Sequence, residues 1–440
     1  MNNSLPIIER DGWLQPVADK IIWRHERFTK RLTEIERGAG SIVDYANGHK
    51  YFGLTRDDAA GGWWFREWAP GAHYVSIFGD FNDWRHDELP LSRDERGVWS
   101  RFFPDSEWGD RIKHGVRYKI GVDGDNGWHE RLPAYTMRAV EEPLTHDFSA
   151  QVWVGEPFDW QGDKFDIASI GSPLIYECHV GMAQEQERVG LYRQFTRDII
   201  PRIKELGYNT IQLMAIAEHP YYGSFGYHVS NLFAPSSRFG TPEELKTLIR
   251  EAHKEGLAVV MDLVHSHYIK NFNEGLNGLD GTDHHYSPAG EAGRQPYWDS
   301  MNFDYGKSEV EHFLLSNIKY WMEEYHFDGF RFDGVTSMIY HHHGYIDFGS
   351  YDSFFGEGVN EDALCYLSLA NELIHKLNPS AITIAEDVSG MPGMTVPTEE
   401  GGTGFDYRLA MATPDYWIKL LEDVPDDDWD IFEMWHSLSN

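Results

Sequence analysis

One short stretch combines residue types that could perform nucleophilic chemistry. It is GFRFDGV, residues 329–335, in which Phe330 and Phe332 alternate with Arg331 and Asp333 as they would along a short strand. Side chains two residues apart on a strand share a face, so the guanidinium should lie beside the carboxylate and favour its ionised form. An ionised carboxylate at a strand end is a good nucleophile or cation stabiliser. The alternative is a structural Arg–Asp pair.

The same pattern of an apolar run ending in polar residues recurs along the chain. Such ends carry Glu177 and His179, Asp262 and His267, and Glu386 and Asp387. From about residue 170 the runs alternate with amphipathic helical patterns, which is typical of βαβ units. The predicted strands are 173–182, 209–216, 257–267, 329–335, 381–389 and 405–411.

Six such units in series predict an α/β fold, a (β/α)8 barrel that is incomplete. Barrel enzymes place their chemistry at the carboxyl ends of the strands, where these polar residues lie. A doubly wound sheet is disfavoured because no Gly-rich phosphate loop follows the first strand.

Helix signals complete the plan. Thr241 with Glu244, and Ser308 with Glu311, have the spacing of capping boxes that open helices. Residues 1–45 contain a helical pattern expected to serve packing, and residues 46–155 alternate as in an all-β module. The predicted domains are therefore a helical segment (1–45), a β-sandwich (46–155) and a partial barrel (170–440).

Composition restricts the partners. Acidic residues outnumber basic ones 71 to 38 over 440 residues, a formal net charge of −33, which disfavours binding to nucleic acid or anionic membranes. Aromatic residues make up 15%, which suits either a large core or platforms for sugar rings. With two cysteines, Cys178 and Cys365, and no long uncharged apolar span, we expect a cytoplasmic protein, a monomer or weak oligomer.

Taken together, the strand ends resemble the α-amylase superfamily of glycoside hydrolases and transglycosylases. DLVHSH (262–267), GFRFDG (329–334) and IAED (384–387) are similar to three signatures of that family, in the same order. Longer stretches resemble one branch, the glycogen branching enzymes of the eukaryotic type. They are IYECHVGM, YYGSFGYHVSNLFAPSSRFGTPEEL, LNGLDGTD, VTSMIYHHHG and AEDVSGMP.

The resemblance implies roles at matching positions. Asp333 would be the nucleophile and Glu386 the acid/base, and the two carboxylates of such a retaining mechanism lie roughly 5 Å apart. Arg331, His267 and Tyr227 would line the donor sugar site, and Asp262 would support it. These four roles are implied by the resemblance alone. The physics agrees, because Arg331 favours ionised Asp333 and partial burial favours protonated Glu386.

A second resemblance covers about 100 residues of the β-module. The run WAPGAHYVSIFGDFNDW (68–84) is similar to the small β-sandwich that precedes the catalytic part of glycogen-active enzymes. It implies glucan contacts at Trp68, Pro70, Trp84, Trp99 and Lys119. The alternative for each tryptophan is a place in the sandwich core.

The implied reaction transfers part of an α-1,4-glucan to a 6-hydroxyl, forming α-1,6 branches in glycogen, and it requires no metal or organic cofactor. The histidine runs at 341–343 and 284–285 lack paired zinc spacing, so they are expected to be polar loop residues.

One departure from the family pattern matters. The family's fourth signature is a His-Asp pair, and no His-Asp dipeptide follows Glu386; the only later histidine, His436, precedes Ser437. The seventh and eighth strands are also missing, so the chain is expected to be C-terminally truncated, with impaired or absent activity. Two alternatives remain open, an α-glucan hydrolase of the same superfamily (amylase or debranching enzyme) and a non-catalytic glucan-binding protein.

Overall fold

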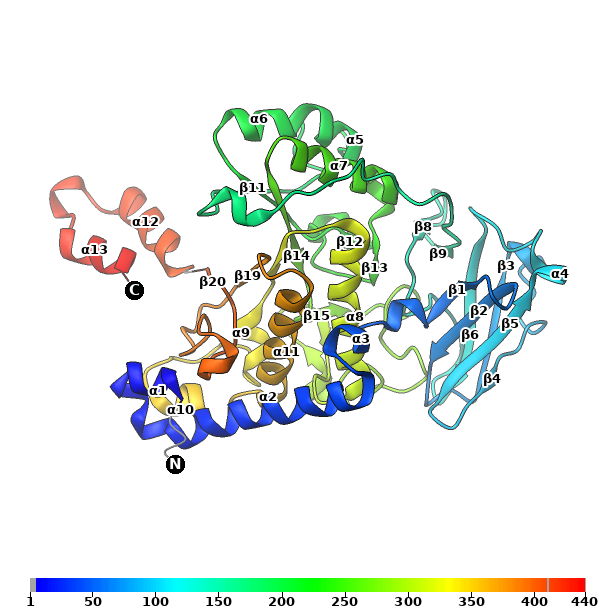
Figure 1. Cartoon of the computed structure of the whole chain (residues 1–440), viewed down its shortest axis with the longest axis horizontal. Coiled ribbons are helices and arrows are strands. Elements are labelled where there is room, and N and C mark those ends of the chain that lie inside the picture. Colours follow the sequence, from blue (N-terminus) through cyan, green and yellow to red (C-terminus); the bar gives the residue numbers. More distant parts are fainter. Residues whose placement is uncertain (1–4, 410, 440) are drawn as a thin grey trace. The chain divides into compact units, whose positions relative to one another are not determined.

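The computed structural model describes residues 5–409 and 411–439, and its contacts divide the chain into two compact units (Figure 1). The larger unit comprises residues 32–330 and 373–381. The smaller unit comprises residues 1–31, 331–372 and 382–440. Three of the four boundaries between the units fall within elements, α2 (Ala18–Ala39), β18 (Gly329–Phe332) and α11 (Glu361–Leu377), and the fourth lies directly before residue 382.

The larger unit begins with a β-sandwich of two antiparallel sheets. One sheet has the strand order β1-β2-β5-β4, and the other has the order β3-β6-β9-β8 with β7 paired to β6. The strands are β1 (Gly53–Asp57), β2 (Gly62–Trp68), β3 (Tyr74–Gly79), β4 (Ser92–Arg93), β5 (Val98–Pro104), β6 (Arg117–Gly124), β7 (Gly127–Arg131), β8 (Ala139–Glu141) and β9 (Phe148–Gln151). Period-2 alternation turns side chains such as Trp63, Phe65, Val75 and Ile77 into one shared core.

The larger unit then forms part of a parallel sheet. β10 (Ile175–Cys178), β11 (Thr210–Leu213) and β14 (Ala258–Leu263) pair in that order, all parallel. The accompanying helical elements are α5 (Tyr192–Gln194), a π-helical turn (Phe195–Ile199), α6 (Ile200–Glu205), α7 (Pro242–Lys254) and α8 (Ser308–Tyr325). Two small antiparallel additions are β12 (Ala217–Glu218) with β13 (Asn231–Pro235), and β15 (His267–Ile269) with β17 (Ser300–Asn302) and β16 (Arg294–Gln295).

The two predicted capping boxes have different outcomes. At α7 the Thr241 hydroxyl accepts from the Glu244 N–H, and the Glu244 carboxylate accepts from the Thr241 N–H, so this prediction is confirmed. At α8 the N-cap is Lys307, and no side-chain bond caps the helix. The predicted box of Ser308 and Glu311 is therefore wrong, because Ser308 is already the first helical residue and lies one position too late to cap.

The smaller unit contains the remaining parallel strands. β19 (Ile382–Ala385) pairs in parallel with β20 (Tyr407–Arg408), and the Glu386 N–H donates to the Phe332 carbonyl at the end of β18 at 3.1 Å. The other helices of this unit are α1 (Pro6–Arg10), α9 (Val335–Ile339), α10 (Tyr351–Phe355), α12 (Ala412–Asp423) and α13 (Ile431–Ser439). The short β20 lies within the predicted run 405–411.

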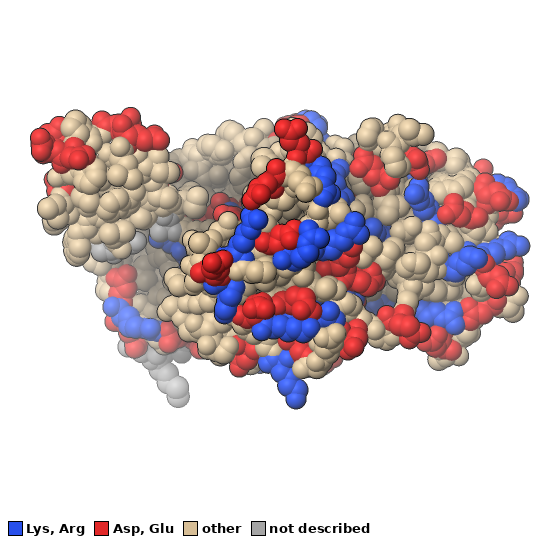
Figure 2. All heavy atoms as spheres, turned by 90° about the horizontal axis from the view of Figure 1, so that it is seen from above, with Lys and Arg blue, Asp and Glu red and all other residues tan. Residues whose placement is uncertain are grey.

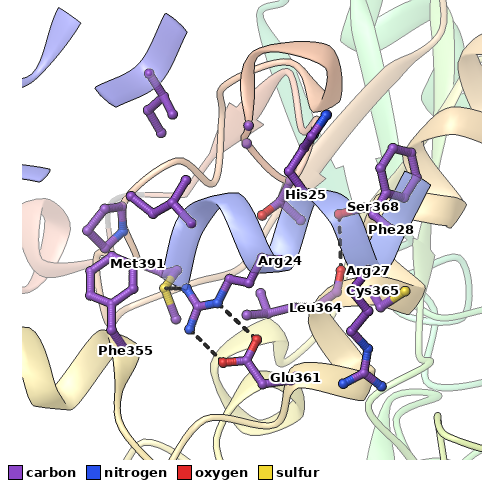
Figure 3. A pocket seen from close by; sticks show the side chains of 16 residues that line it. Arg24, His25, Arg27, Phe28, Phe355, Glu361, Leu364, Cys365, Ser368 and Met391 are labelled. Carbon is purple, nitrogen blue, oxygen red and sulfur yellow. Dashed lines mark hydrogen bonds and ion pairs between the residues drawn. The ribbon is translucent and has the colours of Figure 1, made fainter. Parts of the chain in front are cut away.

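The first part of α2 is fixed in the smaller unit by a half-buried arginine. Arg24 donates to the Glu361 carboxylate through Nε and through Nη2, each at 2.9 Å (Figure 3). Its Nη2 also donates to the Phe354 carbonyl at 2.8 Å. Bidentate pairs of this kind fix geometry as well as adding energy. The pair borders a pocket whose other lining side chains include Ile21, Phe28, Leu364 and Met391. Helix α2 thus has the packing role that its pattern predicts.

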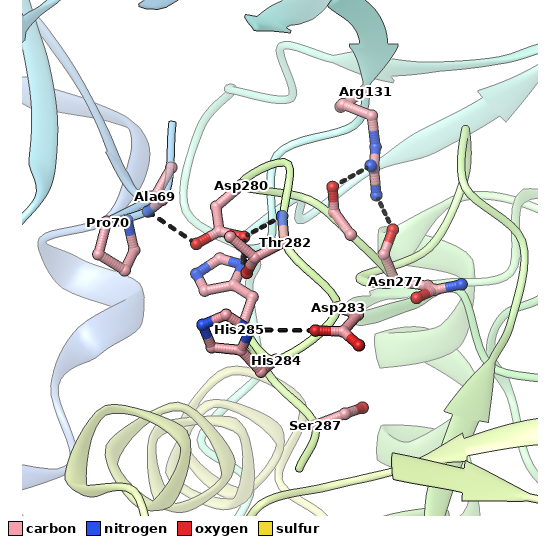
Figure 4. A network of polar contacts seen from close by, with 12 residues as sticks. Ala69, Pro70, Arg131, Asn277, Asp280, Thr282, Asp283, His284, His285 and Ser287 are labelled. Carbon is pink, nitrogen blue, oxygen red and sulfur yellow. Dashed lines mark hydrogen bonds and ion pairs between the residues drawn. The ribbon is translucent and has the colours of Figure 1, made fainter. Parts of the chain in front are cut away.

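A polar network joins the β-sandwich to the loop 275–287 within the larger unit (Figure 4). The Arg131 guanidinium donates to the carbonyls of Gly275, Asn277 and Gly278 at 2.6–2.9 Å. The Asp280 carboxylate accepts from the Gly71 N–H at 2.8 Å, so it holds the turn that follows Trp68 and Pro70. The stretch LNGLDGTD therefore has a structural role, to dock the loop against the sandwich.

The surface carries charges of both signs. On the face drawn in Figure 2, Lys and Arg side chains are interspersed with Asp and Glu side chains. Ion pairs between exposed groups of the larger unit include Lys50–Glu323 at 2.9 Å and Arg56–Asp105 at 2.5 Å. Exposed pairs contribute little stability individually.

One ion cluster is buried. His253 contacts Asp163 through Nδ1 at 2.6 Å and Asp328 through Nε2 at 3.0 Å, and its side chain is 4% exposed. Burial alone would lower the pKa of His253, but the two carboxylates outweigh it and raise that pKa. The same contact lowers the pKa of Asp163 against the effect of its burial, whereas burial raises the pKa of Asp328. The contact with His253 thus favours the ionised form of Asp163, while at Asp328 burial outweighs the same contact.

This cluster predicts pH-dependent stability. His253→Gln should lower the free energy of unfolding of the larger unit by on the order of 3 kcal/mol near pH 6, because it removes one partner of a buried ion pair. Since the folded pKa of His253 is raised above 6.5, its stabilisation is full below that value and fades as pH rises through the folded pKa. Urea unfolding of both proteins at about pH 6 and about pH 9 measures the difference.

His73→Gln is the matched control, because His73 and Asp125 form an exposed pair at 3.3 Å. It should change stability little at either pH. An equal loss for His253→Gln at both pH values would contradict a charged His253.

Candidate active site

Arg331 lies between two carboxylates at the ends of β18 and β19. Its Nη1 donates to Asp333 Oδ1 at 2.8 Å, and its Nη2 contacts Glu386 Oε1 at 2.8 Å. The three side chains are 7%, 12% and 24% exposed respectively, so the cluster is mostly shielded from water yet open at the glutamate. A planar guanidinium presents its donors in a fixed fork, which holds both carboxylates within a few ångströms of each other.

Glu386 is also bound by the turn that follows Asp333. Its Oε2 accepts from the Gly334 N–H at 2.7 Å, while its own N–H bonds the Phe332 carbonyl. Gly334 adopts φ +60°, a left-handed conformation that favours glycine and aims this N–H at the carboxylate. The carboxyl group of Glu386 is thus placed by the nucleophile strand as much as by its own strand.

The pKa of Glu386 is raised. Burial is the largest cause, and the charge of Asp333 and a hydrogen bond to it act in the same direction. Arg331 and the Gly334 N–H oppose the shift without cancelling it. A carboxyl group with a raised pKa beside an arginine-paired carboxylate has the arrangement of an acid/base next to a nucleophile.

The other predicted sugar-site residues form a second group, in the larger unit. The Tyr227 hydroxyl donates to Asp262 Oδ2 at 2.6 Å, and Asp262 is fully buried. Tyr227 itself is half-buried, so one part of its ring remains accessible. This hydrogen bond fixes the hydroxyl end of Tyr227 on a buried carboxylate.

His267 is buried and uncharged. Burial lowers its pKa to about 4, with the His228 charge acting in the same direction and the bond to Tyr227 opposing it. Its Nε2 donates to the Tyr227 carbonyl at 2.8 Å, so Nδ1 carries no proton and accepts from the Ser266 hydroxyl at 2.9 Å. Both ring nitrogens are engaged within the protein, so donation to a sugar hydroxyl requires the exchange of the bond to Tyr227.

The β-module residues separate into two groups. Trp99 is 6% exposed in the sandwich core, with its indole N–H on the Ala69 carbonyl at 2.9 Å, which is the alternative that the sequence left open. Lys119 is 5% exposed and pairs with Glu130 at 3.1 Å and Asp147 at 2.6 Å. Neither side chain presents a surface to a glucan in this conformation.

Trp68, Pro70 and Trp84 remain half-buried. Trp68 packs on His285 with ring centroids 4.4 Å apart, and the Trp84 indole N–H donates to Asp80 Oδ1 at 2.9 Å. Each keeps part of its surface open, so their predicted glucan contacts stay compatible with the structure.

Three features of the site were missed from the sequence. The first is the Gly334 N–H, because a backbone donor leaves no residue-type signal. The second is the pair of Thr336 and Asp387, whose hydrogen bond at 2.8 Å spans fifty-one positions of sequence. The third is Trp128 on β7, which is 38% exposed and packs on His86 with ring centroids 4.9 Å apart. It directly follows the sequence DGDNG, which indicated only a turn.

The histidine runs differ in their surroundings. His285 is buried 4.0 Å from Asp280, His284 contacts Asp283 at 3.1 Å, and His342 stacks on Tyr340 at 5.0 Å. Across residues 5–409 and 411–439, no group of three or more His, Cys, Asp or Glu side chains is arranged to hold a metal ion. Within the same ranges, no helix has both the length and the apolar character that crossing a membrane demands.

Two family models match the chain. Residues 51–136 match carbohydrate-binding module 48, the isoamylase N-terminal domain, and residues 197–287 match the α-amylase catalytic domain. Solved structures agree at the level of fold. The group B Streptococcus pullulanase SAP aligns with a TM-score of 0.60 at 20% identity, over 77% of this chain and 46% of that one. The catalytic module of the pneumococcal glycogen-degrading protein SpuA aligns with a TM-score of 0.59 at 18% identity, over 77% and 50%.

The chain therefore combines a match to carbohydrate-binding module 48 with a later match to the α-amylase catalytic domain, and its fold is that of part of a (β/α)8 barrel. Curated relatives of the chain are named 1,4-alpha-glucan-branching enzymes. They include proteins of Dictyostelium discoideum (48% identity), Solanum tuberosum (46%) and Felis catus (45%), each matched over 99% of this chain. The chain spans 64%, 52% and 62% of the lengths of these relatives.

The raised pKa of Glu386 predicts a gain in stability when it is neutralised. Because its ionised form is disfavoured in the folded state, the stability of the smaller unit falls as pH rises through the folded pKa. Glu386→Gln should therefore raise the midpoint of thermal unfolding at about pH 8 and change it less at about pH 4, where the carboxyl is protonated in both states.

Glu399→Gln, at an exposed position of the same unit, is the control and should leave the midpoint nearly unchanged at both pH values. A lower midpoint for Glu386→Gln at the higher pH would contradict a raised pKa of Glu386 in the folded chain.

Proposed function

We propose that this chain carries the bond-cleaving centre of an α-glucan branching transglycosylase. One observation supports this most strongly: a single guanidinium, Arg331, binds both Asp333 and Glu386 at the carboxyl ends of adjacent strands. Asp333 is the proposed nucleophile, and Glu386, with its raised pKa, is the proposed acid/base. The names of the curated relatives support a branching enzyme, although this chain spans less than two thirds of their length.

The first step cleaves an α-1,4 bond of the donor glucan. An Asp333 carboxylate oxygen forms a bond to C1 of the glucose unit as the C1–O4 bond breaks. Glu386 gives its proton to the departing O4, so the leaving chain ends in a neutral hydroxyl and Glu386 becomes a carboxylate. The product is a glucosyl ester on Asp333, as in double-displacement glycosidases.

The second step forms the branch. The 6-hydroxyl of an acceptor chain attacks C1, Glu386 takes the hydroxyl proton, and the C1–O bond to Asp333 breaks. The result is an α-1,6 linkage with the anomeric configuration retained after two inversions. Glu386 is protonated again and Asp333 is again ionised, so the centre returns to its starting state.

The remaining assignments concern substrate binding. Tyr227, held by Asp262, is the proposed stacking surface for the donor ring. His267 is the proposed donor of a hydrogen bond to a hydroxyl group of that sugar. Trp68, Pro70 and Trp84 are the proposed glucan contacts of the carbohydrate-binding module, whereas Trp99 and Lys119 support it from inside. The proposed domain plan remains 1–45, 46–155 and 170–440, and the proposed partner is an α-1,4-glucan such as glycogen.

The proposed compartment is the cytoplasm, and the proposed state is a monomer or weak oligomer. Cys178 and Cys365 are both present as thiols, and thiols persist in a reducing compartment.

Hydrolysis is the second candidate. If water replaces the acceptor hydroxyl in the second step, the same two carboxylates release a reducing sugar. The two functions are distinguished with amylose as substrate. Branching lowers iodine staining without releasing reducing ends in proportion, whereas hydrolysis releases them.

Covalent capture tests the proposed centre directly. An activated glucosyl fluoride transfers its sugar without an acid, because fluoride is a good leaving group. The chain should therefore gain the mass of one glucosyl group on Asp333. Glu386→Gln should accumulate this adduct, because the base for the second step is missing, and Asp333→Asn should form none. Intact mass spectrometry measures the adduct, and its formation on Asp333→Asn would contradict the assignment.

A further inference from the structure

A second set of hydrogen bonds links the turns that follow β18 and β19. The Thr336 hydroxyl donates to Asp387 Oδ1 at 2.8 Å and accepts from the Val388 N–H at 2.9 Å. Thr336 is 7% exposed and Asp387 is fully buried. One hydroxyl therefore bonds both residues that come directly after Glu386.

Asp387 itself is the anchor of the loop after β19. Its Oδ1 also accepts from the Ser389 N–H at 3.0 Å and the Ser389 hydroxyl at 2.6 Å. Its Oδ2 accepts from the N–H groups of Gly390 at 3.1 Å and Met391 at 3.3 Å. A buried carboxylate needs this many donors to remain stable, and each donor fixes the backbone that leads away from Glu386.

The two turns are thus joined on both sides of Glu386. At residue 386, the N–H donates to the Phe332 carbonyl, and the carboxylate binds the Gly334 N–H and Arg331. After it, the bonds come from Thr336. Residues 332, 334 and 336 belong to the segment that carries Asp333, so this segment determines where the second carboxylate lies.

We propose that Thr336, acting through Asp387, is a positioning residue that holds Glu386 at working distance from Asp333. This inference rests on the proposed function and deepens it. Thr336 touches neither sugar nor reacting atom; it fixes the main chain on which the acid/base stands. A misplacement of about 1 Å can lower a catalysed rate about 10²-fold, so a modest shift of this turn is sufficient to matter.

The chain offers a matched control for this role. Thr383 lies in β19 and is fully buried; it donates through Oγ1 to Asp406 Oδ2 at 3.1 Å and accepts from the Asp406 N–H at 3.2 Å. Thr336→Val and Thr383→Val each remove one donated and one accepted bond and preserve shape. Only the first removal lies between the two catalytic turns. Thr336→Ser keeps the hydroxyl and is the rescue variant.

The test separates the two chemical steps with the glucosyl fluoride. Capture of the sugar by Asp333 needs no acid, whereas transfer of the sugar from Asp333 to a glucan acceptor needs Glu386 as base. Thr336→Val should slow transfer by about 10²-fold and slow capture little. Thr336→Ser and Thr383→Val should transfer at close to the unaltered rate. Equal slowing of both steps in Thr336→Val, or equal effects in the two valine variants, would overturn the proposal.

A second readout is independent of turnover. Carbon-13 titration of the Glu386 carboxyl in the 440-residue chain reports its pKa. Besides burial, the groups that act on this pKa are Arg331 and the Gly334 N–H, which lower it, and Asp333, which raises it. A displacement of Glu386 from Arg331 and the Gly334 N–H removes the two interactions that lower its pKa, so Thr336→Val should raise this pKa while Thr383→Val and Thr336→Ser leave it in place.

The two failures are distinguishable. If the unaltered chain forms no adduct with the fluoride, the proposed function fails at Asp333, and the titration alone then decides the positioning role. If the adduct forms but Thr336→Val leaves the Glu386 pKa and the transfer rate unchanged, the positioning role fails and the proposed function stands.

Discussion

The structure of the site depends on one guanidinium shared by two carboxylates. Two adjacent carboxylates repel each other, so without a compensating positive charge the pKa of one of them would be strongly raised. Arg331 binds Asp333 and Glu386 through different nitrogens, so it compensates both charges while fixing their orientation. Burial is the largest cause of the raised pKa of Glu386, and the charge of Asp333 acts in the same direction. One arginine thus holds two chemically similar side chains together, while burial and the charge of Asp333 favour the protonated form of Glu386.

This arrangement needs a rigid backbone, which the strand ends provide. The left-handed Gly334 turns its N–H toward Glu386, and the Thr336 hydroxyl joins the next turn to Asp387. In the larger unit, hydrogen bonds fix a second group of side chains in a similar way. There Asp262 fixes the Tyr227 ring, and His267 is held neutral by burial with its tautomer set by the Tyr227 carbonyl. In both groups the polar atoms are already hydrogen-bonded before any sugar is present, which lowers the reorganisation needed for catalysis.

Sequence patterns predicted what is local. The alternation in residues 329–335 predicted the Arg331–Asp333 pair, and the spacing of Thr241 and Glu244 predicted a helix start that the structure confirms. The same spacing failed at Ser308, because a capping box depends on the backbone conformation of a single residue, and that residue is Lys307. Contacts between distant segments left no signal. The hydrogen bonds from Arg131 to loop 275–287 and from Thr336 to Asp387 depend on how strands and loops meet, and only the fold decides that. Burial likewise separated Trp99 from the more open tryptophans, although all share one motif-rich module.

The central claim is that Asp333 and Glu386 face one sugar unit as a retaining pair. A crystal structure of the chain with an α-1,4-linked oligosaccharide would measure the separation of the two carboxyl groups. The account predicts about 5–5.5 Å, with Arg331 still bound to both and the sugar C1 beside Asp333. A separation beyond about 6.5 Å, or a sugar bound away from both carboxyl groups, would contradict it.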